Sequence, residues 1–507
     1  MSGYIVAIEE EPDTVDFQRT TIHYTVATNV FNRLVEMELG EDGNVKIMPS
    51  LAEKWEESKD GTTYTFYLRK DVKFSNGSPL TASDVLYSFK RMLTIPDTGN
   101  QDIVLIIKGA EKLAAGETDE LEGFKLLDDH TFTITLEEPF EAFLACLSMP
   151  GGSIMDEESA SKAGDQFGQD PAQTIGTGSF VLKEWTPGKG MVLTANKDCF
   201  AGAPQSEGLN LLFITEPEEI RARFESGELD ILDLDDLGSS AEYFVHGDVY
   251  KDRMKEVPQI GISYIALNES KAPLDDVRVR QALQLALDRN ILLDAVYSGR
   301  GETENGIFSH GLYGFNPNLP EIPYDVDKAK QLLKDAGHPN GFDLVFSVKS
   351  SSTQAEMTLA KEAVAMWAGV GIRAEIQNID EEEFMTKRKS GDLACYTATW
   401  IADYNDPDNY ITTFFGSKEN TTGRSLCYPK EDVMRRVRAA RAITDPEARI
   451  EEYQDLEKTI VQDDAAWIPL FSRMRLYVIS NRLDGFVHAW NGSVKNVYSE
   501  MSIKSVP

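Results

Sequence analysis

The sequence predicts an α/β protein built from about three lobes, and three observations lead to this expectation. The chain has 507 residues, which is too long for one compact core. Its N-terminal third shows the period-two alternation of strands, whereas strand and helix patterns alternate from residue 262 onward, which is typical of an α/β lobe. No low-complexity linker separates these parts, so we expect crossing strands to join the lobes and to act as hinges.

The N-terminal third contains strand patterns on both sides of a helix pattern. "TTYTFYLRKDVKF" and "HTFTITLEEPF" alternate apolar and polar side chains, which predicts half-buried strands. Between them, "TASDVLYSFKRML" predicts a helix that Thr81 or Ser83 caps. The stretch 175–196 predicts a loop, a strand, a turn at Pro187-Gly188 and a second strand.

The second half begins with the apolar strand "ISYIALN" from residue 262. One helix is expected across 276–299, capped by Asp275 or Asp276 and ended by Gly299, with Ile291 on its apolar face. The later elements are expected in this order: a helix in 324–342, a strand at 342–348, a helix from 354, the strand "IRAEIQNI", the helix "DEEEFMTKRKSG", the strand "LACYTATW" and a strand-like segment at 467–480.

Charge and hydropathy exclude several classes of protein. The formal net charge of −34 repels phosphate backbones and anionic lipid, so no nucleic-acid partner is expected. No apolar run approaches the roughly 18 residues that span a bilayer. The start "MSGYIVAIEEEPD" lacks the pattern of a signal peptide, so we expect either a cytosolic protein or a mature form whose leader was removed.

The sequence carries none of the common motifs for catalysis or for cofactor binding. The six histidines show no HxxxH or HExxH spacing, and no GxSxG elbow or Walker loop occurs, so we expect no enzyme activity and no cofactor. A hydrolase with an unrecognised carboxylate pair stays open, because nothing among the 84 acidic residues selects a pair. The four cysteines are best read as small buried residues, although a Cys395–Cys427 bridge stays open.

The stretch "TWIADYNDPD" (399–408) places three carboxylates directly after an apolar and aromatic run. A metal site is one interpretation, but the spacing of Asp403, Asp406 and Asp408 matches a calcium loop only superficially. An acid/base pair is the second. The third is a socket for a cation at Asp403, because a carboxylate in a partly dry position needs a positive partner. For Asp406 and Asp408 we favour a turn or a helix cap, since Asp406 precedes Pro407.

Several segments together resemble one family, the extracytoplasmic solute-binding proteins of bacterial ABC importers, family 5, of the oligopeptide/dipeptide-binding type. The matching segments follow the family's order and span nearly the whole chain: "PSLAEKWEESKDGTTYTFYLRKDVKFSNGSPLTASDVLYSFKRML" (49–93), "GTGSFVLKEWTPGKGMVLTAN" (176–196), "DVRVRQALQLALDRNILLDAVYSG" (276–299), "YDVDKAKQLLKDAGHPNGFDL" (324–344) and "TWIADYNDPDNYITTFF" (399–415).

The resemblance implies a two-lobed periplasmic-binding-protein-like fold (type II, cluster C) with an extra β-rich subdomain. Lobe I would be discontinuous, built from 1–42, 172–258 and 470–507. The subdomain would be inserted at 43–171, and lobe II would cover 259–469. The crossing strands would lie near 259–267 and 467–475, where the sequence pattern changes.

The resemblance also implies a site for an extended peptide in a cleft between the two lobes. In its Trp-x-Ala-Asp motif, Asp403 would receive the ligand's α-amino group beside Trp400. The backbone of Thr399 and Ile401 would bond the ligand's main chain, and the opposite wall would come from residues near Ile22, His23 and Tyr24. Lys349 is a candidate for the ligand's carboxylate, although a solvated lysine is the plainer interpretation.

The function implied is that of a monomeric, non-enzymatic binding protein that captures peptides and delivers them to an ABC permease in the membrane. It would be extracytoplasmic, either periplasmic or a cell-surface lipoprotein. Relatives with the same scaffold leave other ligands open, namely a sugar oligomer, a metal chelate or glutathione. A peptide-sensing role without transport also stays open.

Overall fold

The computed structural model of the chain describes residues 3–21, 23–40, 44–235, 237, 241–492 and 497–504. They form two compact units, one of Met1–Val257 with Arg475–Pro507 and the other of Pro258–Met474. The chain thus leaves the first unit once and returns to it once. The predicted lobe boundaries, including a separate subdomain at 43–171, stay a prediction.

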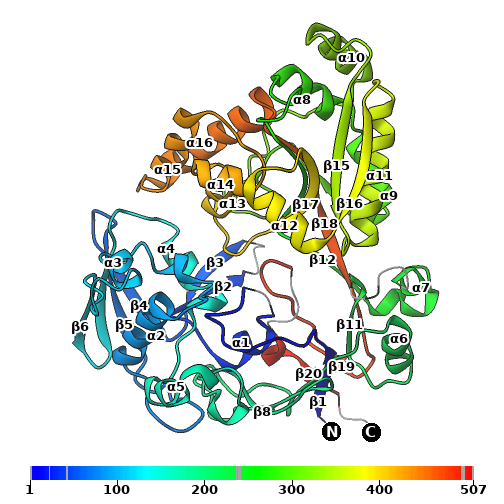
Figure 1. Cartoon of the computed structure of the whole chain (residues 1–507). Helices are drawn as coiled ribbons and strands as arrows, with labels where there is room; N and C mark the ends of the chain where they lie inside the picture. Colours follow the sequence, from blue (N-terminus) through cyan, green and yellow to red (C-terminus); the bar gives the residue numbers. More distant parts are fainter. Residues whose placement is uncertain are drawn as a thin grey trace. The chain divides into compact units, whose positions relative to one another are not determined.

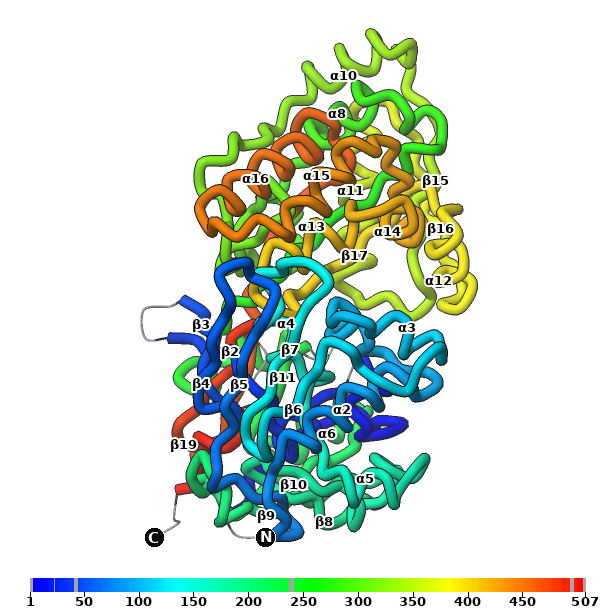
Figure 2. Tube along the Cα trace, turned by 90° about the vertical axis from the view of Figure 1, so that its left-hand side faces the viewer, coloured from blue at the N-terminus to red at the C-terminus, as the bar shows by residue number. Residues whose placement is uncertain are grey.

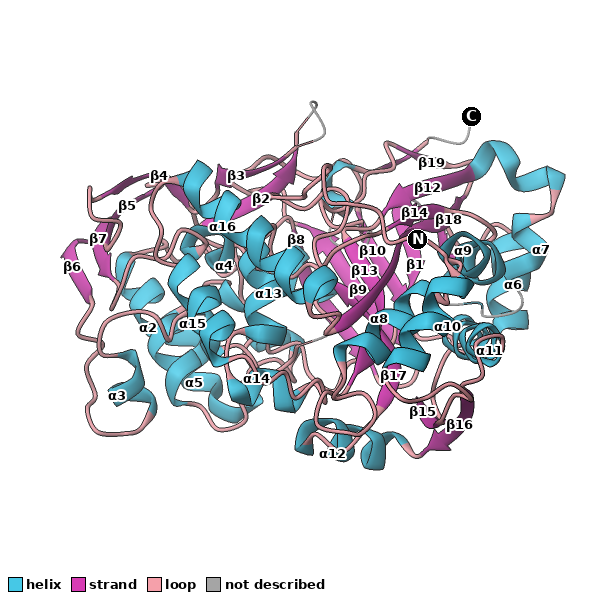
Figure 3. Cartoon of the chain, turned by 90° about the horizontal axis from the view of Figure 1, so that it is seen from above, coloured by secondary structure: helices cyan, strands magenta, loops and turns pink. Residues whose placement is uncertain are grey.

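The second unit is an α/β/α layer structure. Its sheet has the strand order β16-β15-β17-β13-β18, in which β15 is parallel to β16 and β17, and β13 is antiparallel to β17 and β18. Helices α9 and α11 lie on one side of this sheet and α13–α16 on the other (Figures 1 and 3). The central strand β13 is buried on both faces, which explains its apolar run "ISYIAL".

The elements of the second unit follow the predicted alternation. Its strands are β13 (Gly261–Leu267), β14 (Gly301–Thr303), β15 (Asp343–Lys349), β16 (Arg373–Ile379), β17 (Cys395–Ile401) and β18 (Trp467–Ile479), the last of which continues into the first unit. Its helices are α8 (Val277–Leu285), α9 (Arg289–Tyr297), α10 (Val326–Asp335), α11 (Gln354–Ala368), α12 (Glu381–Ser390), α13 (Pro407–Phe415), α14 (Lys418–Gly423), α15 (Glu431–Ala440) and α16 (Pro446–Lys458).

The single helix expected across 276–299 is wrong, because the structure has two helices there. Asp276 caps α8, as predicted, but α8 ends at Leu285. Asp288 then accepts hydrogen bonds from the N–H groups of Asn290 and Ile291 and so caps a new helix, α9. Ile291, expected on the buried face, is exposed. An aspartate inside an apolar period was the signal for this break.

The first unit contains a larger sheet and two smaller strand pairings. In the larger sheet, β1 is parallel to β10 and β11, and β10, β9 and β8 follow in antiparallel order. The end of β18 pairs with β11 in the same unit. Its strands are β1 (Tyr4–Ile8), β8 (Phe180–Thr186), β9 (Gly190–Ala195), β10 (Gly208–Leu212), β11 (Ile231–Asp233) and β12 (Met254–Pro258), and the helices of this part are α1 (Thr25–Val30), α5 (Glu157–Ala163), α6 (Pro217–Glu225) and α7 (Ala241–Val245).

A four-stranded antiparallel sheet, in the order β4-β5-β7-β6, forms another part of the first unit, with α2 and α3 beside it (Figure 2). The two predicted strands are β5 and β7, and Thr81 caps α2 in a capping box with Asp84. The remaining elements are β2 (Val35–Leu39), β3 (Val45–Pro49), β4 (Ala52–Glu57), β5 (Thr63–Leu68), α2 (Ala82–Thr94), α3 (Ala110–Ala114), β6 (Phe124–Asp128), β7 (Thr131–Thr135), α4 (Phe143–Leu147), β19 (Leu483–Asp484) and β20 (Ser502–Ile503).

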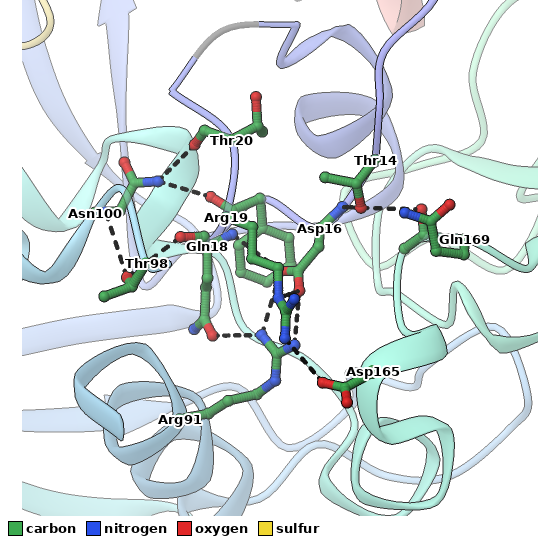
Figure 4. A network of polar contacts seen from close by, with 12 residues as sticks. Thr14, Asp16, Gln18, Arg19, Thr20, Arg91, Thr98, Asn100, Asp165 and Gln169 are labelled. Atoms are coloured by element: carbon green, nitrogen blue, oxygen red, sulfur yellow. Dashed lines mark hydrogen bonds and ion pairs between the residues drawn. The ribbon is translucent and has the colours of Figure 1, made fainter. Parts of the chain in front are cut away.

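A buried polar network fixes the loop between β1 and α1 to α2 (Figure 4). Arg91 of α2 lies 2.6 Å from Asp16 and donates a second hydrogen bond of 2.7 Å to Gln18. Asn100 donates to the carbonyls of Phe17 and Thr20 at 3.0 and 2.7 Å. These hydrogen bonds hold the loop backbone at Phe17 and Thr20, just before His23 and Tyr24 in the chain.

Glu457 of α16 is a buried carboxyl group that makes folding depend on pH. One of its oxygens accepts the N–H groups of Ile307 and Phe308 at 2.7 and 2.8 Å, and burial raises its pKa to about 8. Between the ordinary carboxyl pKa and about 8, the folded state keeps a proton that the unfolded state has lost. Stability therefore falls as pH rises through this window.

Glu457→Gln is expected to flatten this pH dependence, because glutamine has the same shape and no proton to lose. In the wild type, the group lowers the free energy of unfolding by up to about 1.4 kcal/mol per pH unit within the window. Urea unfolding at several pH values between 5 and 8 measures the difference between the two proteins. Parallel stability profiles would show that Glu457 does not titrate in this way.

Candidate ligand-binding site

The candidate site begins at a strand edge of β17 that has no partner strand in the described part of the chain. β13 pairs with β17 along its whole length, from Cys395 to Ile401. On the other side β15 pairs only with Cys395 and Tyr396. The N–H of Ala402 donates to Ile260 on the β13 side. Because strand residues alternate in direction, Thr397, Thr399 and Ile401 present their N–H and C=O groups to the open edge.

Trp400 anchors the end of β17 on one face of the sheet. Its ring packs edge-on against Phe414 of α13, with the centroids 5.4 Å apart. Its indole Nε1 donates a hydrogen bond of 3.2 Å to the side-chain oxygen of Asn409, also on α13. Trp400 is half-buried, which fits one apolar face against the helix and one accessible side.

Asp403 is oriented by the same asparagine. Asn409 Oδ1 accepts the backbone N–H of Asp403 at 3.0 Å, and Asn409 Nδ2 donates to Asp403 Oδ2 at 3.1 Å. The amide orientation of Asn409 is determined by its neighbours, because the indole N–H and the backbone N–H are both donors and require an oxygen. One asparagine therefore holds both Trp400 and Asp403.

The Asp403 carboxylate is accessible and yet crowded by protein. The residue is exposed to solvent. Desolvation by the surrounding protein nevertheless raises its pKa, and the Asn409 amide and the Arg424 charge offset only part of that rise. The Asn409 amide bonds one of the two carboxylate oxygens, which leaves the other available for a cation.

Asp406 and Asp408 have structural roles, as the turn interpretation predicted. Asp406 caps α13 by accepting the N–H of Asp408 at 2.8 Å. It also forms two hydrogen bonds of 2.8 and 2.7 Å with the guanidinium group of Arg449. Asp408 is paired with Arg441 at 3.0 Å. The three carboxylates of "TWIADYNDPD" therefore do not converge on one ion.

The other predicted contact residues belong to other segments of the chain. Lys349 ends β15, two residues beyond the last residue of β15 that pairs with β17. Ile22 lies outside the described residues. His23 and Tyr24 belong to the first unit. The His23 ring lies 3.9 Å from Glu10, and the Tyr24 hydroxyl is 2.9 Å from both the Thr20 carbonyl and the Asn100 side chain. Their roles toward a ligand stay predictions.

The cysteine bridge left open by the sequence is not formed. Cys395 and Cys427 are both free thiols. Cys395 is fully buried at the start of β17, and Cys427 lies against the carbonyl of Gly391 at 3.9 Å. Cys395 therefore serves as a small buried residue at the start of β17.

Asn409 is a site residue that sequence reasoning missed. The available signal was a polar residue in the first turn of an otherwise apolar helix, six positions after Asp403. Asn409→Ala is expected to raise the pKa of Asp403 further, because the amide that stabilises its charged form is lost. NMR titration of the Asp403 carboxyl carbon measures this shift, and an unchanged pKa would contradict the arrangement.

Comparison with known proteins matches the chain to a described family and to solved structures. The family of bacterial extracellular solute-binding proteins, family 5 (middle), matches residues 46–422. Heme-binding protein A of Haemophilus influenzae is 30% identical over 483 residues, covering 92% of this chain and 86% of the relative. The dipeptide-binding protein of Escherichia coli K12 is 30% identical over 476 residues, covering 89% and 84%.

Solved structures show the same fold over almost the whole chain. HbpA2 from Haemophilus parasuis is 28% identical with a TM-score of 0.80, covering 99% of this chain and all of that one. The periplasmic binding protein DppA of Helicobacter pylori, in complex with the peptide STSA, has a TM-score of 0.79 at 23% identity, covering 99% and 98%.

These likenesses and the two α/β units define a periplasmic-binding-protein fold, which confirms the predicted fold class. The chain belongs to the bacterial extracellular solute-binding proteins, family 5. No helix in the described ranges is long and apolar enough to cross a membrane.

Proposed function

We propose that this protein binds short peptides by their main chain and their N-terminal ammonium group. The observation that carries the proposal is the open edge of β17, which ends two residues before an accessible carboxylate at Asp403. An extended peptide fits such an edge as an added strand, because its own N–H and C=O groups repeat at the same spacing.

Each part of the site recognises a feature common to all peptides. The backbone groups of Thr397, Thr399 and Ile401 would bond the ligand's main chain, whatever its side chains. Asp403 would receive the α-ammonium group in charge-assisted hydrogen bonds, which are roughly twice as strong as neutral ones. Trp400 would form the apolar wall beside that ammonium group. The predicted roles of His23, Tyr24 and Lys349 as further ligand contacts belong to the same proposal.

The relatives support a role in import rather than in catalysis. They include the dipeptide-binding protein of Escherichia coli and the periplasmic oligopeptide-binding protein OppA of Salmonella typhimurium. We infer that the chain is an extracytoplasmic monomer that delivers peptide to an ABC permease and releases its ligand unchanged.

Titration calorimetry with trialanine and N-acetyl-trialanine tests the proposal. Acetylation removes the ammonium charge and leaves the main chain intact, so the acetylated peptide is expected to bind at least about tenfold more weakly. Mass spectrometry of the peptide after incubation checks that it is not cleaved. Equal affinity for the two peptides would contradict the ammonium contact, and cleavage would favour a hydrolase instead.

Native mass spectrometry of the purified protein tests the other ligand classes. A sugar oligomer, a metal chelate, glutathione or haem bound in place of a peptide would each give a characteristic added mass. Such an adduct, together with no binding of trialanine, would replace the peptide proposal.

A further inference from the structure

The segment that joins β14 to α10, residues 304–325, is a long loop without a helix or a strand. Structureless loops longer than about 12–15 residues are uncommon in compact domains and usually have a function. This loop belongs to the second unit, and its residues Ile307 and Phe308 are buried there. Its first part is therefore packed into the unit and is not a solvated connection.

The carboxyl group of Glu457 on α16 holds this first part of the loop. Its Oε1 accepts the N–H groups of Ile307 and Phe308. The loop backbone lies directly on the carboxyl group, because a Cβ atom added at Gly306 would clash with the same oxygen. The other oxygen, Oε2, is buried and has no hydrogen-bond partner among the described residues. This packing suits a protonated carboxyl group, because an ionised one would need further donors or water.

The charged groups nearby also disfavour the ionised form of Glu457. Burial, and in addition the negative charge of Glu304, raise the pKa of Glu457. The Glu304 carboxylate accepts the backbone N–H of His310 at 3.0 Å and lies 3.0 Å from its Nδ1. Arg289 donates to the backbone carbonyls of Glu304 and Ile322. His310 and Arg289 thus contact Glu304, whereas the groups that bond Glu457 in the described part of the chain are neutral amides.

The same loop contacts the segment that carries Asp403 at two points. The Tyr313 N–H donates a 2.8 Å hydrogen bond to the side-chain oxygen of Asn405, two residues after Asp403. The Ser309 hydroxyl lies 3.3 Å from the hydroxyl of Tyr410 on α13, the helix whose asparagine orients the Asp403 side chain. A displacement of the loop therefore reaches Asp403 both through its own segment and through α13.

We propose that Glu457 is a positioning residue, which in its protonated form holds the 304–325 loop against α16 and so keeps Asp403 placed for the ligand's ammonium group. Loss of the proton leaves a charge in a tightly packed position, and the loop moves away from α16 so that water can hydrate it. Peptide is then released more readily at mildly alkaline pH. The inference rests on the proposed peptide-binding function and adds a proton-dependent control to it.

Carboxyl-carbon NMR of the protein without peptide tests the positioning. Between about pH 6 and pH 9, the Asp403 signal of the wild type is expected to shift with the same midpoint as the signal of Glu457. In Glu457→Gln, which keeps the shape of the protonated group, this shift should be absent. Glu451→Gln is the matched control, because Glu451 is exposed on the same helix, and it should behave as the wild type. An Asp403 signal that stays constant while Glu457 titrates overturns the inference, and this wild-type result decides even if a variant does not fold.

His310 is a second titratable group of the loop, and a further variant separates it from Glu457. The hydrogen bond to Glu304 raises the pKa of His310 above its ordinary value. His310→Gln should keep the shift of the Asp403 signal, because Glu457 still loses its proton. A shift that is lost in His310→Gln and kept in Glu457→Gln would assign the effect to the histidine and overturn the inference.

Titration calorimetry with trialanine relates the positioning to binding. Between pH 6.5 and pH 8.5 the wild type is expected to lose at least about fivefold more affinity than Glu457→Gln. The peptide's own ammonium group also loses its proton in this range, but that loss affects both proteins equally. An equal fall of affinity in both proteins overturns the proton-dependent control and leaves the peptide proposal standing. If trialanine does not bind at either pH, the proposed function fails, whereas the NMR comparison still decides whether Glu457 positions Asp403.

Discussion

Asp403→Asn is expected to weaken trialanine binding by more than about a hundredfold, which corresponds to about 3 kcal/mol. The substitution keeps the size and the hydrogen-bonding capacity of the side chain but removes the charge that would face the ligand's ammonium group. Binding of N-acetyl-trialanine should be nearly unchanged, because that peptide has no ammonium group. Titration calorimetry of both peptides with the wild type and with Asp403→Asn gives the four dissociation constants.

Asp275→Asn is the matched control for this charge change, since Asp275 is exposed in the same unit. It should bind trialanine as the wild type does. A similar loss in both variants would mean that the overall negative charge, rather than a contact at Asp403, attracts the peptide.

The proposed contact between Asp403 and the peptide's ammonium group also predicts how binding depends on pH. Desolvation raises the pKa of Asp403, so its carboxylate takes up a proton at a higher pH than an ordinary aspartate. The peptide's ammonium group stays charged below pH 7. Wild-type affinity for trialanine should therefore fall as pH falls through the raised pKa, whereas the weak binding by Asp403→Asn should stay constant.

Arg449→Met is expected to lower the free energy of unfolding by about 3–5 kcal/mol, because it leaves the buried Asp406 carboxylate without its partner. The two side chains are almost fully buried and share two hydrogen bonds. Peptide binding should weaken too, because Asp406 caps the helix that carries Asn409. Thermal or urea unfolding measures the first effect and calorimetry the second.

The double variant Asp406→Ser with Arg449→Met separates the ion pair from the helix cap. Serine keeps a capping oxygen, and the pair of changes removes both buried charges together. Most of the lost stability should return. A double variant as unstable as Arg449→Met alone would show that shape, rather than an uncompensated charge, causes the loss.

Most elements could be predicted from the sequence because their signals are local. The alternation in "TYTFYL" correctly predicted β5, and α2 starts after its predicted cap at Thr81. The expected helix across 276–299 failed at Asp288 because its apolar positions continue in helical phase past that cap. Periodicity indicates which face of a segment is buried, but it does not indicate whether the segment forms one unbroken helix.

The candidate site could be predicted only in part. The order Trp400, Asp403, Asp406, Asp408 can be read from the chain, and the proline after Asp406 favoured a turn there. Asn409 left only a weak signal in the sequence, because its relation to Trp400 and Asp403 depends on where α13 packs against β17.

The sequence by itself determined the class of fold, the family and the strand that ends in Trp-x-Ala-Asp, because these depend on local patterns and on their order along the chain. Only the tertiary structure decided which of three neighbouring carboxylates is available to a ligand. Asp406 and Asp408 are neutralised by Arg449 and Arg441, which lie more than 30 residues further along the chain, whereas the side chain that bonds the Asp403 carboxylate in the described part of the chain is the uncharged Asn409. A carboxylate's role depends on the charges that surround it in space, and the linear sequence does not record them.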